Sequence, residues 1–166
     1  MKKNNLQNII LDNIDVKNKI QRISLEILED NIDEKKIIFF GISDNGKIIT
    51  KRIITCINKI SKIGLDLVSV NINNINNIKF DKNFDADKKS LVIVSDVSHS
   101  SKTLQHVISK LINFNPSKIK TAVIVNRDHS LFPVKINFSG LNLSTSVNEH
   151  VDVEVNEDNE FTVYLN

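Results

Sequence analysis

The chain has 166 residues, of which 40% are hydrophobic and 25% charged, the composition of one folded domain with its own core. Its formal net charge of +2 is too nearly balanced to indicate nucleic acid or a membrane surface by charge alone. The single Cys56 excludes an internal disulfide and a thiolate metal site, and no apolar run reaches the length of a membrane span. We therefore expect one cytoplasmic domain over residues 1–166, with no membrane partner and with Cys56 in its core.

Apolar periodicity predicts strands and helices in alternation along most of the chain. Short runs rich in β-branched residues predict strands, and longer segments with apolar residues three or four apart predict helices. The predicted elements are an edge strand or arm at Leu6–Leu11, a helix over Val16–Asn31 capped by Asp12, Asn13 or Asp15, a strand over Lys36–Ile42, a helix over about Lys47–Ile63, strands at Asp66–Ile72 and Leu91–Val94, a helix over Leu104–Ile112, strands at Ser117–Val125 and Ile136–Leu143, and a terminal hairpin of Val151–Val155 with Glu160–Leu165. This order predicts an α/β fold with an open, mainly parallel sheet flanked by helices and a small C-terminal β hairpin or hood.

The first candidate ligand loop follows the predicted strand Lys36–Ile42 and runs from Gly41 to Gly46. Glycines at both ends would let the backbone approach a ligand or adopt a positive φ. A carboxylate at Asp44 opposes binding of an anion, by about 4 kcal/mol for unit charges ~4 Å apart at an effective dielectric near ~20. The other interpretation is an ordinary turn in which Asp44 or Asn45 caps the next helix.

The second candidate loop lies in the stretch Leu91–Thr103, LVIVSDVSHSSKT. Here a buried strand is followed by Asp96 at its carboxyl end, then by a polar loop and an amphipathic helix. A strand, a hydroxyl-rich loop and a helix start together place free backbone N–H groups and a helix dipole against a phosphate. The alternative is a Ser/Thr-rich helix start that binds nothing.

This stretch resembles the phosphoribosyl-pyrophosphate motif of type I phosphoribosyltransferases. That motif has four apolar residues, two acidic residues, a short mixed stretch and Thr-Gly-basic-Thr; here Ser95 stands for the first acid and Ser100-Ser101 for Thr-Gly. The order of features over nearly the whole chain is most similar to the bifunctional pyrimidine-operon attenuators with uracil phosphoribosyltransferase activity. The late segments Arg127-Asp128-His129 and Phe132-Pro133-Val134 fit that branch as well.

The resemblance implies a pentosyltransferase of nucleotide salvage. It would transfer phosphoribose from phosphoribosyl pyrophosphate to a nucleobase, most simply uracil, with Mg²⁺ as cofactor and as a homodimer or larger oligomer. The implied catalytic residues are Asp96, which would also bind the metal, and His99. The implied substrate-binding residues are Ser95, Ser98, Ser100, Ser101, Lys102 and Thr103 around the phosphate and ribose, Ser43, Asp44, Asn45 and Gly46 around the pyrophosphate, and Arg127.

The chemistry of three positions qualifies these roles. With Ser95 in place of an acid, a cationic transition state loses stabilisation, by about a few kcal/mol. A positive φ at Ser101 would cost roughly 1 kcal/mol in place of glycine. His99 stands where purine-salvage members carry an acid beside the base, so it would exchange a proton with the base near neutral pH; the alternative is an exposed loop histidine.

Two further regions leave alternatives open. The stretch Asn73–Lys89 corresponds to a mobile flap over the substrate in active members, but it is short and lacks their Arg-Asp-Asp cluster, so we also consider a catalytically weak homologue that binds nucleotide or phosphoribosyl pyrophosphate as a regulator. In the attenuator branch the first helix contributes to an RNA-binding surface, here Lys17, Lys19 and Arg22; the alternative is a solvated helix face. The residues after Val125 are expected to form a hood over the base, usually through backbone groups.

Overall fold

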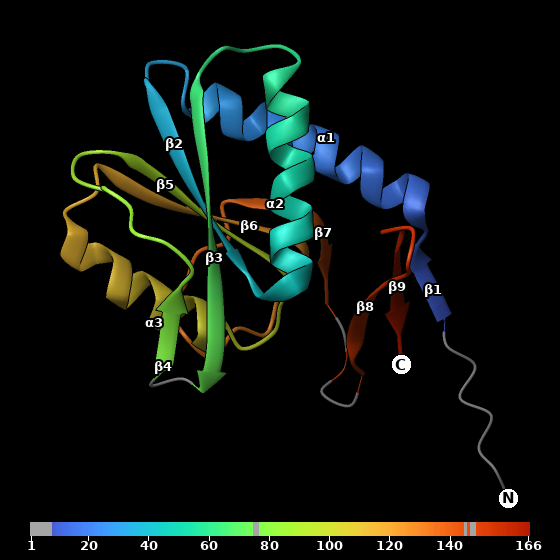
Figure 1. Cartoon of the computed structure of the whole chain (residues 1–166). Coiled ribbons are helices and arrows are strands. Elements are labelled where there is room, and N and C mark those ends of the chain that lie inside the picture. Colours follow the sequence, from blue (N-terminus) through green and yellow to red (C-terminus); the bar gives the residue numbers. More distant parts are fainter. Residues whose placement is uncertain (1–7, 75–76, 145, 147–148) are drawn as a thin grey trace, which may run out of the picture.

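The computed structural model describes all residues except 1–7, 75–76, 145 and 147–148 (Figure 1). The elements in chain order are β1 (Asn8–Leu11), α1 (Asn13–Asp30), β2 (Lys36–Ile42), α2 (Ser43–Asn58), β3 (Gly64–Asn74), β4 (Asn77–Phe80), β5 (Ser90–Ser98), α3 (Lys102–Leu111), the 3-10 helix η1 (Ile112–Phe114), β6 (Lys118–Arg127), β7 (Phe138–Leu143), β8 (Val151–Val155) and β9 (Phe161–Leu165). None of the described helices is long and apolar enough to cross a membrane.

The main sheet has six strands in the order β4-β3-β2-β5-β6-β7. All neighbours are parallel except β4, which pairs antiparallel with β3 at one edge. Helices α1 and α2 cover one face and α3 covers the other, as Figure 1 shows. The middle strands are apolar in continuous runs because both of their faces are buried, which confirms the predicted α/β fold.

A second, three-stranded sheet brings the two ends of the chain together in the order β1-β9-β8. Strands β8 and β9 form the predicted antiparallel hairpin, and β1 adds to its other edge as the predicted edge strand; Leu6 lies outside the described residues. The inward side chains Val151, Phe161 and Val163 are buried in the same core cluster as α1 and α2. This small sheet is therefore fixed to the helical face of the domain.

Helix α1 begins at Asn13, three residues before the predicted start at Val16, because Asp12 forms a capping box. The Asp12 carboxylate accepts a hydrogen bond from the Asp15 N–H, and the Asp15 carboxylate accepts one from the Asp12 N–H. Asp12 is thus the cap among the three candidates. The buried face of the helix carries Val16, Ile20, Ile23 and Ile27 at helical spacing.

Helix α2 begins at Ser43 rather than Lys47 and ends at Asn58 rather than Ile63. The expected cap was wrong, since Ile42 is the N-cap and no side chain caps the helix; Asp44 and Asn45 lie inside the first turn. The early start depends on Gly46, where a Cβ would lie 2.7 Å from the carbonyl oxygen of Val94. The absence of that Cβ lets the first turn of α2 lie directly on β5.

Strand β5 also differs from its predicted bounds, because it continues to Ser98. Pairing with β6 extends as far as Ser98 opposite Asn126, so Asp96 lies inside the strand and not after it. The carboxylate is therefore attached to sheet backbone, which fixes its direction more firmly than a loop would.

The stretch that corresponds to the flap contains a short strand and an aromatic cluster. Strand β4 pairs with β3, and Phe80 and Phe84 pack edge-on against the buried Phe40, with ring centroids 5.6 and 5.0 Å away. Phe84 also contacts Phe114 at 4.9 Å. These contacts place the described part of residues 73–89 on the α3 face of the sheet.

Candidate functional site

The candidate site lies where the sheet changes winding direction. After β2 the chain passes through α2 on one face to β3, and after β5 it passes through α3 on the other face to β6. The neighbouring carboxyl ends of β2 and β5 therefore flank a crevice, which is the usual ligand position in an open α/β sheet.

A cavity of about 330 Å³ occupies this crevice. It brings together the end of β2, the end of β5, the following loop and the first turn of α3. The lining residues are Ile42, Ser43, Ser95, Asp96, Val97, Ser98, His99, Ser100, Ser101, Lys102, Thr103 and Leu104. All predicted residues of the Ser95–Thr103 stretch, together with Ser43, thus share one cavity, whereas Asp44, Asn45, Gly46 and Arg127 are not among its lining residues.

The loop before α3 has a backbone that suits an anion. Ser101 has φ 63°, the left-handed conformation in which glycine is the usual residue. This turn directs the first-turn N–H groups of α3 to the cavity end of the helix, where its dipole is positive. Lys102 and Thr103 stand exposed on that turn and add a cation and a hydroxyl.

Buried serine hydroxyls hold the loop in this shape. The Ser98 and Ser101 hydroxyl oxygens are 2.9 Å apart, and the Ser130 hydroxyl donates to the Ser101 hydroxyl at 2.8 Å. Ser98 and Ser101 are buried, at 2% and 5% exposure. Ser98 and Ser101 therefore form the frame of the loop, and the more accessible Ser100, Lys102 and Thr103 are left to face a ligand.

The chain after β6 supports the same loop from behind. The carbonyl oxygen of Ser100 accepts hydrogen bonds from the Leu131 and Phe132 N–H groups, each at 3.1 Å. The described residues just after β6 thus hold the loop at residues 98–103, which differs from the hood expected of them. Sequence reasoning missed Ser130, and the only available signal was its position in the polar cluster after a strand.

Asp96 is held at both carboxylate oxygens. Its Oδ1 accepts from the Val97 N–H at 2.8 Å and from the Ser95 hydroxyl at 3.3 Å, and its Oδ2 accepts from the Asn45 Nδ2 at 2.8 Å. A carboxylate has about four lone-pair positions, so capacity for a ligand remains. Ser95 thus orients the remaining acid but adds no charge.

The first loop separates into residues with different surroundings. Ser43 lines the cavity and has φ 62°. Asp44 is exposed in the first turn of α2, where its negative charge interacts favourably with the positive end of the helix dipole. Asn45 donates to Asp96 and also to the Val153 carbonyl oxygen of β8, at 3.2 Å. Gly46 serves the close approach of α2 to β5 and, like the other glycines, has no positive φ.

His99 meets Arg127 at the mouth of the cavity. The Arg127 Nη1 and the His99 Nδ1 are 3.3 Å apart, and the Arg127 Nη2 also donates to the Ser146 carbonyl oxygen. Partial burial of the ring and the nearby Arg127 cation lower the pKa of His99, against the opposing pull of Asp96. The lowered pKa favours the neutral form of the imidazole.

A second cleft of about 350 Å³ adjoins the first. Asp96, Val97 and His99 line both, and β8 supplies the opposite wall of the second. The predicted C-terminal hood therefore consists of β8 at this point, with Asp152 and Glu154 facing the cleft. Within the described part of the chain, no group of three or more His, Cys, Asp or Glu side chains is arranged to hold a metal ion.

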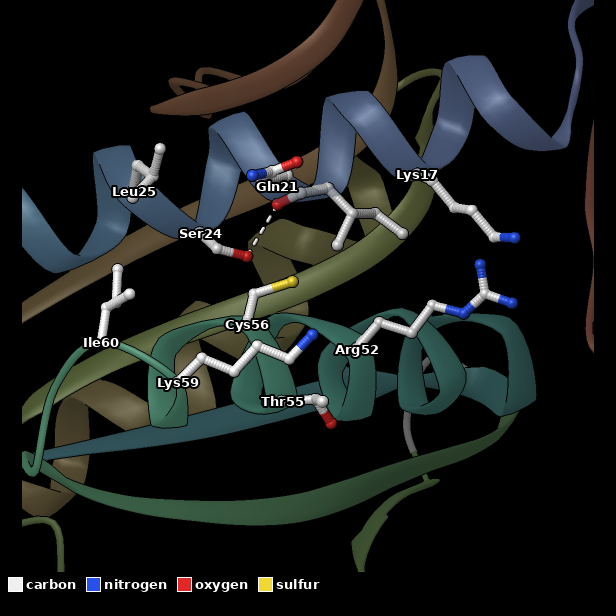
Figure 2. Close-up of a pocket in the computed structure, with 10 residues that line it drawn as sticks. Lys17, Gln21, Ser24, Leu25, Arg52, Thr55, Cys56, Lys59 and Ile60 are labelled. Carbon is white, nitrogen blue, oxygen red and sulfur yellow. Dashed lines mark hydrogen bonds between the residues drawn. The ribbon is translucent and has the colours of Figure 1, made fainter.

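A cavity of about 520 Å³ lies elsewhere, in a groove between α1 and α2 (Figure 2). It is lined mainly by apolar surface, with Lys17, Arg52 and Lys59 at its rim, and Cys56 is half-buried there instead of fully in the core. Arg22 instead pairs with Glu26 and donates to the Ser139 and Gly140 carbonyl oxygens beside β7. The three residues predicted to contact RNA therefore do not form one continuous face, since Lys17 faces α2 and Arg22 faces β7.

Comparison with known proteins identifies the family to which the chain is similar. The sequence profile of the phosphoribosyl transferase domain matches residues 7–158. The bifunctional protein PyrR of Clostridium kluyveri is 32% identical over 163 residues, covering 92% of both chains, and that of Fusobacterium nucleatum is 30% identical, covering 90% of this chain and 91% of its own.

Solved structures share the fold at low identity. The hypoxanthine phosphoribosyltransferase of Trypanosoma cruzi superposes with a TM-score of 0.78 at 12% identity, over 94% of this chain and 95% of its own. A hypoxanthine-guanine phosphoribosyltransferase of Bacillus anthracis superposes with a TM-score of 0.72 at 13% identity, over 84% of each chain. On the match over nearly its whole length, the chain belongs to the phosphoribosyltransferase family.

Proposed function

We propose that the protein transfers phosphoribose from phosphoribosyl pyrophosphate to a nucleobase, with uracil as the base. The observation that carries this proposal is the pair of adjoining cavities that share Asp96 and His99. A nucleotide has its phosphate, ribose and base in that order, and the site offers an anion loop, a carboxylate and a second cleft in the same order. Uracil is proposed because the relatives that cover most of the chain are PyrR proteins and the sequence resembles the attenuator branch.

The 5-phosphate would bind at the loop before α3. The first-turn N–H groups of the helix, the Ser100 and Thr103 hydroxyls and the Lys102 ammonium supply donors and positive charge at one point. The buried hydroxyl chain behind the loop keeps these donors in place before the ligand arrives.

Asp96 would accept hydrogen bonds from the ribose hydroxyls and stabilise positive charge on the ribose ring. Magnesium in such sites is bound by one or two carboxylates together with substrate phosphates, so the single Asp96 is a sufficient protein ligand for a Mg²⁺–pyrophosphate complex. When bound, that ion would neutralise the charge that develops on the pyrophosphate leaving group.

His99 would accept the proton that the base loses as its nitrogen attacks. A neutral imidazole is required for that role, and the lowered pKa favours that form. Arg127 only donates, so in neutral His99 the Nδ1 accepts from Arg127 and Nε2 carries the proton. The base proton would therefore go to Nδ1, and Arg127 would give up its hydrogen bond to that atom.

A turnover assay tests this proposal. The protein is incubated with Mg²⁺, labelled phosphoribosyl pyrophosphate and each common base, and we expect uridine monophosphate from uracil and loss of product in Asp96→Asn. No nucleotide from any base would overturn the enzyme proposal.

The second candidate is a binding protein with little or no turnover. Two observations favour it: among the described residues, Asp96 is the only carboxylate that lines the first cavity, and none of residues 73–89 lines it. A site without a covering flap excludes water less well. Calorimetry decides between the enzyme and the binding protein, because micromolar binding of uridine monophosphate without turnover supports the binding protein.

RNA binding and a homodimer remain predictions from the resemblance, to be tested by a salt-dependent gel shift and by sedimentation.

A further inference from the structure

We propose that Asn45 is a positioning residue that holds Asp96 in its ribose-binding orientation and joins it to the small sheet. This inference rests on the proposed function and deepens it. The sequence suggested that Asn45 would contact pyrophosphate, but its side chain lies behind Asp96 and not in the cavity.

Two acceptors define the orientation of the Asn45 amide. Its Nδ2 lies 2.8 Å from the Asp96 Oδ2 and 3.2 Å from the Val153 carbonyl oxygen. A carboxylate and a backbone carbonyl are both pure acceptors, so only the NH₂ group of the amide satisfies them. One side chain at the start of α2 thus connects β5 to β8.

The close packing of α2 on β5 makes this reach possible. Gly46 follows directly, and its lack of a Cβ brings the first turn of α2 against the Val94 carbonyl oxygen. The short Asn45 side chain then spans the remaining gap to Asp96. The glycine in this loop is therefore explained by the placement of Asn45, without contact to a ligand.

Asn45 fixes the Asp96 Oδ2, which no other side chain holds among the residues that the structure describes. The Val97 N–H and the Ser95 hydroxyl both donate to Oδ1. Without Asn45, only Oδ1 is held, and Oδ2 is free to move. Asp96 separates the phosphate cavity from the β8 cleft, so a turned carboxylate no longer presents its lone pairs where a ribose would lie. The loss falls on recognition of the ribose hydroxyls and leaves the phosphate loop intact.

The test compares two nucleotides that differ only in those hydroxyls. Calorimetry gives the affinities of uridine monophosphate and of 2′,3′-dideoxyuridine monophosphate for the wild type and for Asn45→Ala. We expect the wild type to prefer the ribonucleotide, and Asn45→Ala to reduce that preference roughly three- to tenfold, the effect of one net hydrogen bond. Affinity for the dideoxynucleotide should stay within about twofold, since the phosphate donors are unchanged.

Asn13→Ala is the matched control. Its side chain donates to Glu160 and accepts from the Phe161 N–H, so the change loosens the same small sheet without touching Asp96. The control should keep the wild-type preference. Asn45→Leu, which is of similar size and presents no donor, should lose the preference as Asn45→Ala does and serves if the alanine variant does not fold.

The outcomes separate this inference from the proposed function. An unchanged preference in both Asn45 variants, or an equal loss in Asn13→Ala, overturns the positioning role while the proposed function stands. Failure of the wild type to bind either nucleotide, or equal affinity of the wild type for both, overturns the ribose site itself and with it both proposals.

Discussion

Ser101 occupies a backbone position that glycine would fill without strain, since its φ is 63°. For an L-residue this conformation costs about 1 kcal/mol. Its hydroxyl compensates, because it bonds both Ser98 and Ser130 in a buried site, and each such bond contributes about 1 kcal/mol net. The serine that replaces the motif's glycine is therefore stabilised locally.

These opposing terms predict an order of stability at residue 101. Ser101→Gly relieves the strain but loses both bonds, whereas Ser101→Ala keeps the strain and loses both bonds. We expect unfolding free energies in the order Ser, then Gly, then Ala, with alanine about 2 kcal/mol below serine and about 1 kcal/mol below glycine. Urea denaturation measures this order, and an alanine variant at least as stable as the glycine variant would show that the left-handed turn is not retained.

The ionisation of His99 depends on its neighbour Arg127. Partial burial and the guanidinium beside it disfavour the imidazolium, so we expect the NMR titration midpoint of His99 to lie below the usual 6.5. Arg127→Gln removes a cation 3.3 Å from the ring and should move that midpoint upward. A midpoint that stays in place or falls in Arg127→Gln would mean that the two side chains do not meet in solution.

At the scale of elements, the contact of α2 with β5 sets the geometry of the site. A Cβ at Gly46 would lie 2.7 Å from the Val94 carbonyl oxygen, which is backbone and cannot turn aside. Overpacking of this kind costs about 1–3 kcal/mol. We expect Gly46→Ala to lower the unfolding free energy by about 2 kcal/mol, measured in urea.

Gly64→Ala is the control for that change. Gly64 is exposed at the start of β3, and its nearest neighbour to a new Cβ is the Lys35 carbonyl oxygen at 3.2 Å. The expected loss there is less than about 1 kcal/mol. Equal losses at the two glycines would contradict close packing of α2 on β5.

The strands and helices were predictable because their apolar periods are clear. The hairpin of β8 and β9 follows from local sequence and is confirmed. The sequence left three candidates for the cap of α1, and Asp12 is the one that caps it. The boundaries of α2 and β5 were not predictable, because they depend on a contact between Gly46 and Val94, 48 positions apart. A local sequence pattern does not encode a contact between residues so far apart in the chain.

At the scale of the whole molecule, the site is assembled from four segments that are distant in sequence. The Ser95–Thr103 stretch was identified from sequence, and the structure gathers all of it around one cavity. The parts that sequence reasoning missed are those brought in by tertiary packing, namely Ser130 behind the loop and β8 beside Asp96.

The small sheet makes the integrity of the site depend on both chain ends. Strand β1 pairs with β9, β9 pairs with β8, and β8 forms the wall opposite Asp96. The cleft that would hold the base thus depends on a sheet in which β1 pairs with a strand more than 140 residues away in sequence, as in the pairing of Ile9 with Tyr164.

The central claim is that the loop before α3 grips the phosphate of a ribonucleotide. Isothermal titration calorimetry of the wild type with uridine monophosphate and with uridine tests it most directly, since the two ligands differ only in that phosphate. We predict micromolar binding of the monophosphate and affinity at least about 100-fold weaker for uridine, because the nucleoside lacks the charge-assisted bonds to the helix start. Equal affinity for the two ligands, or no binding of the monophosphate, would contradict the account.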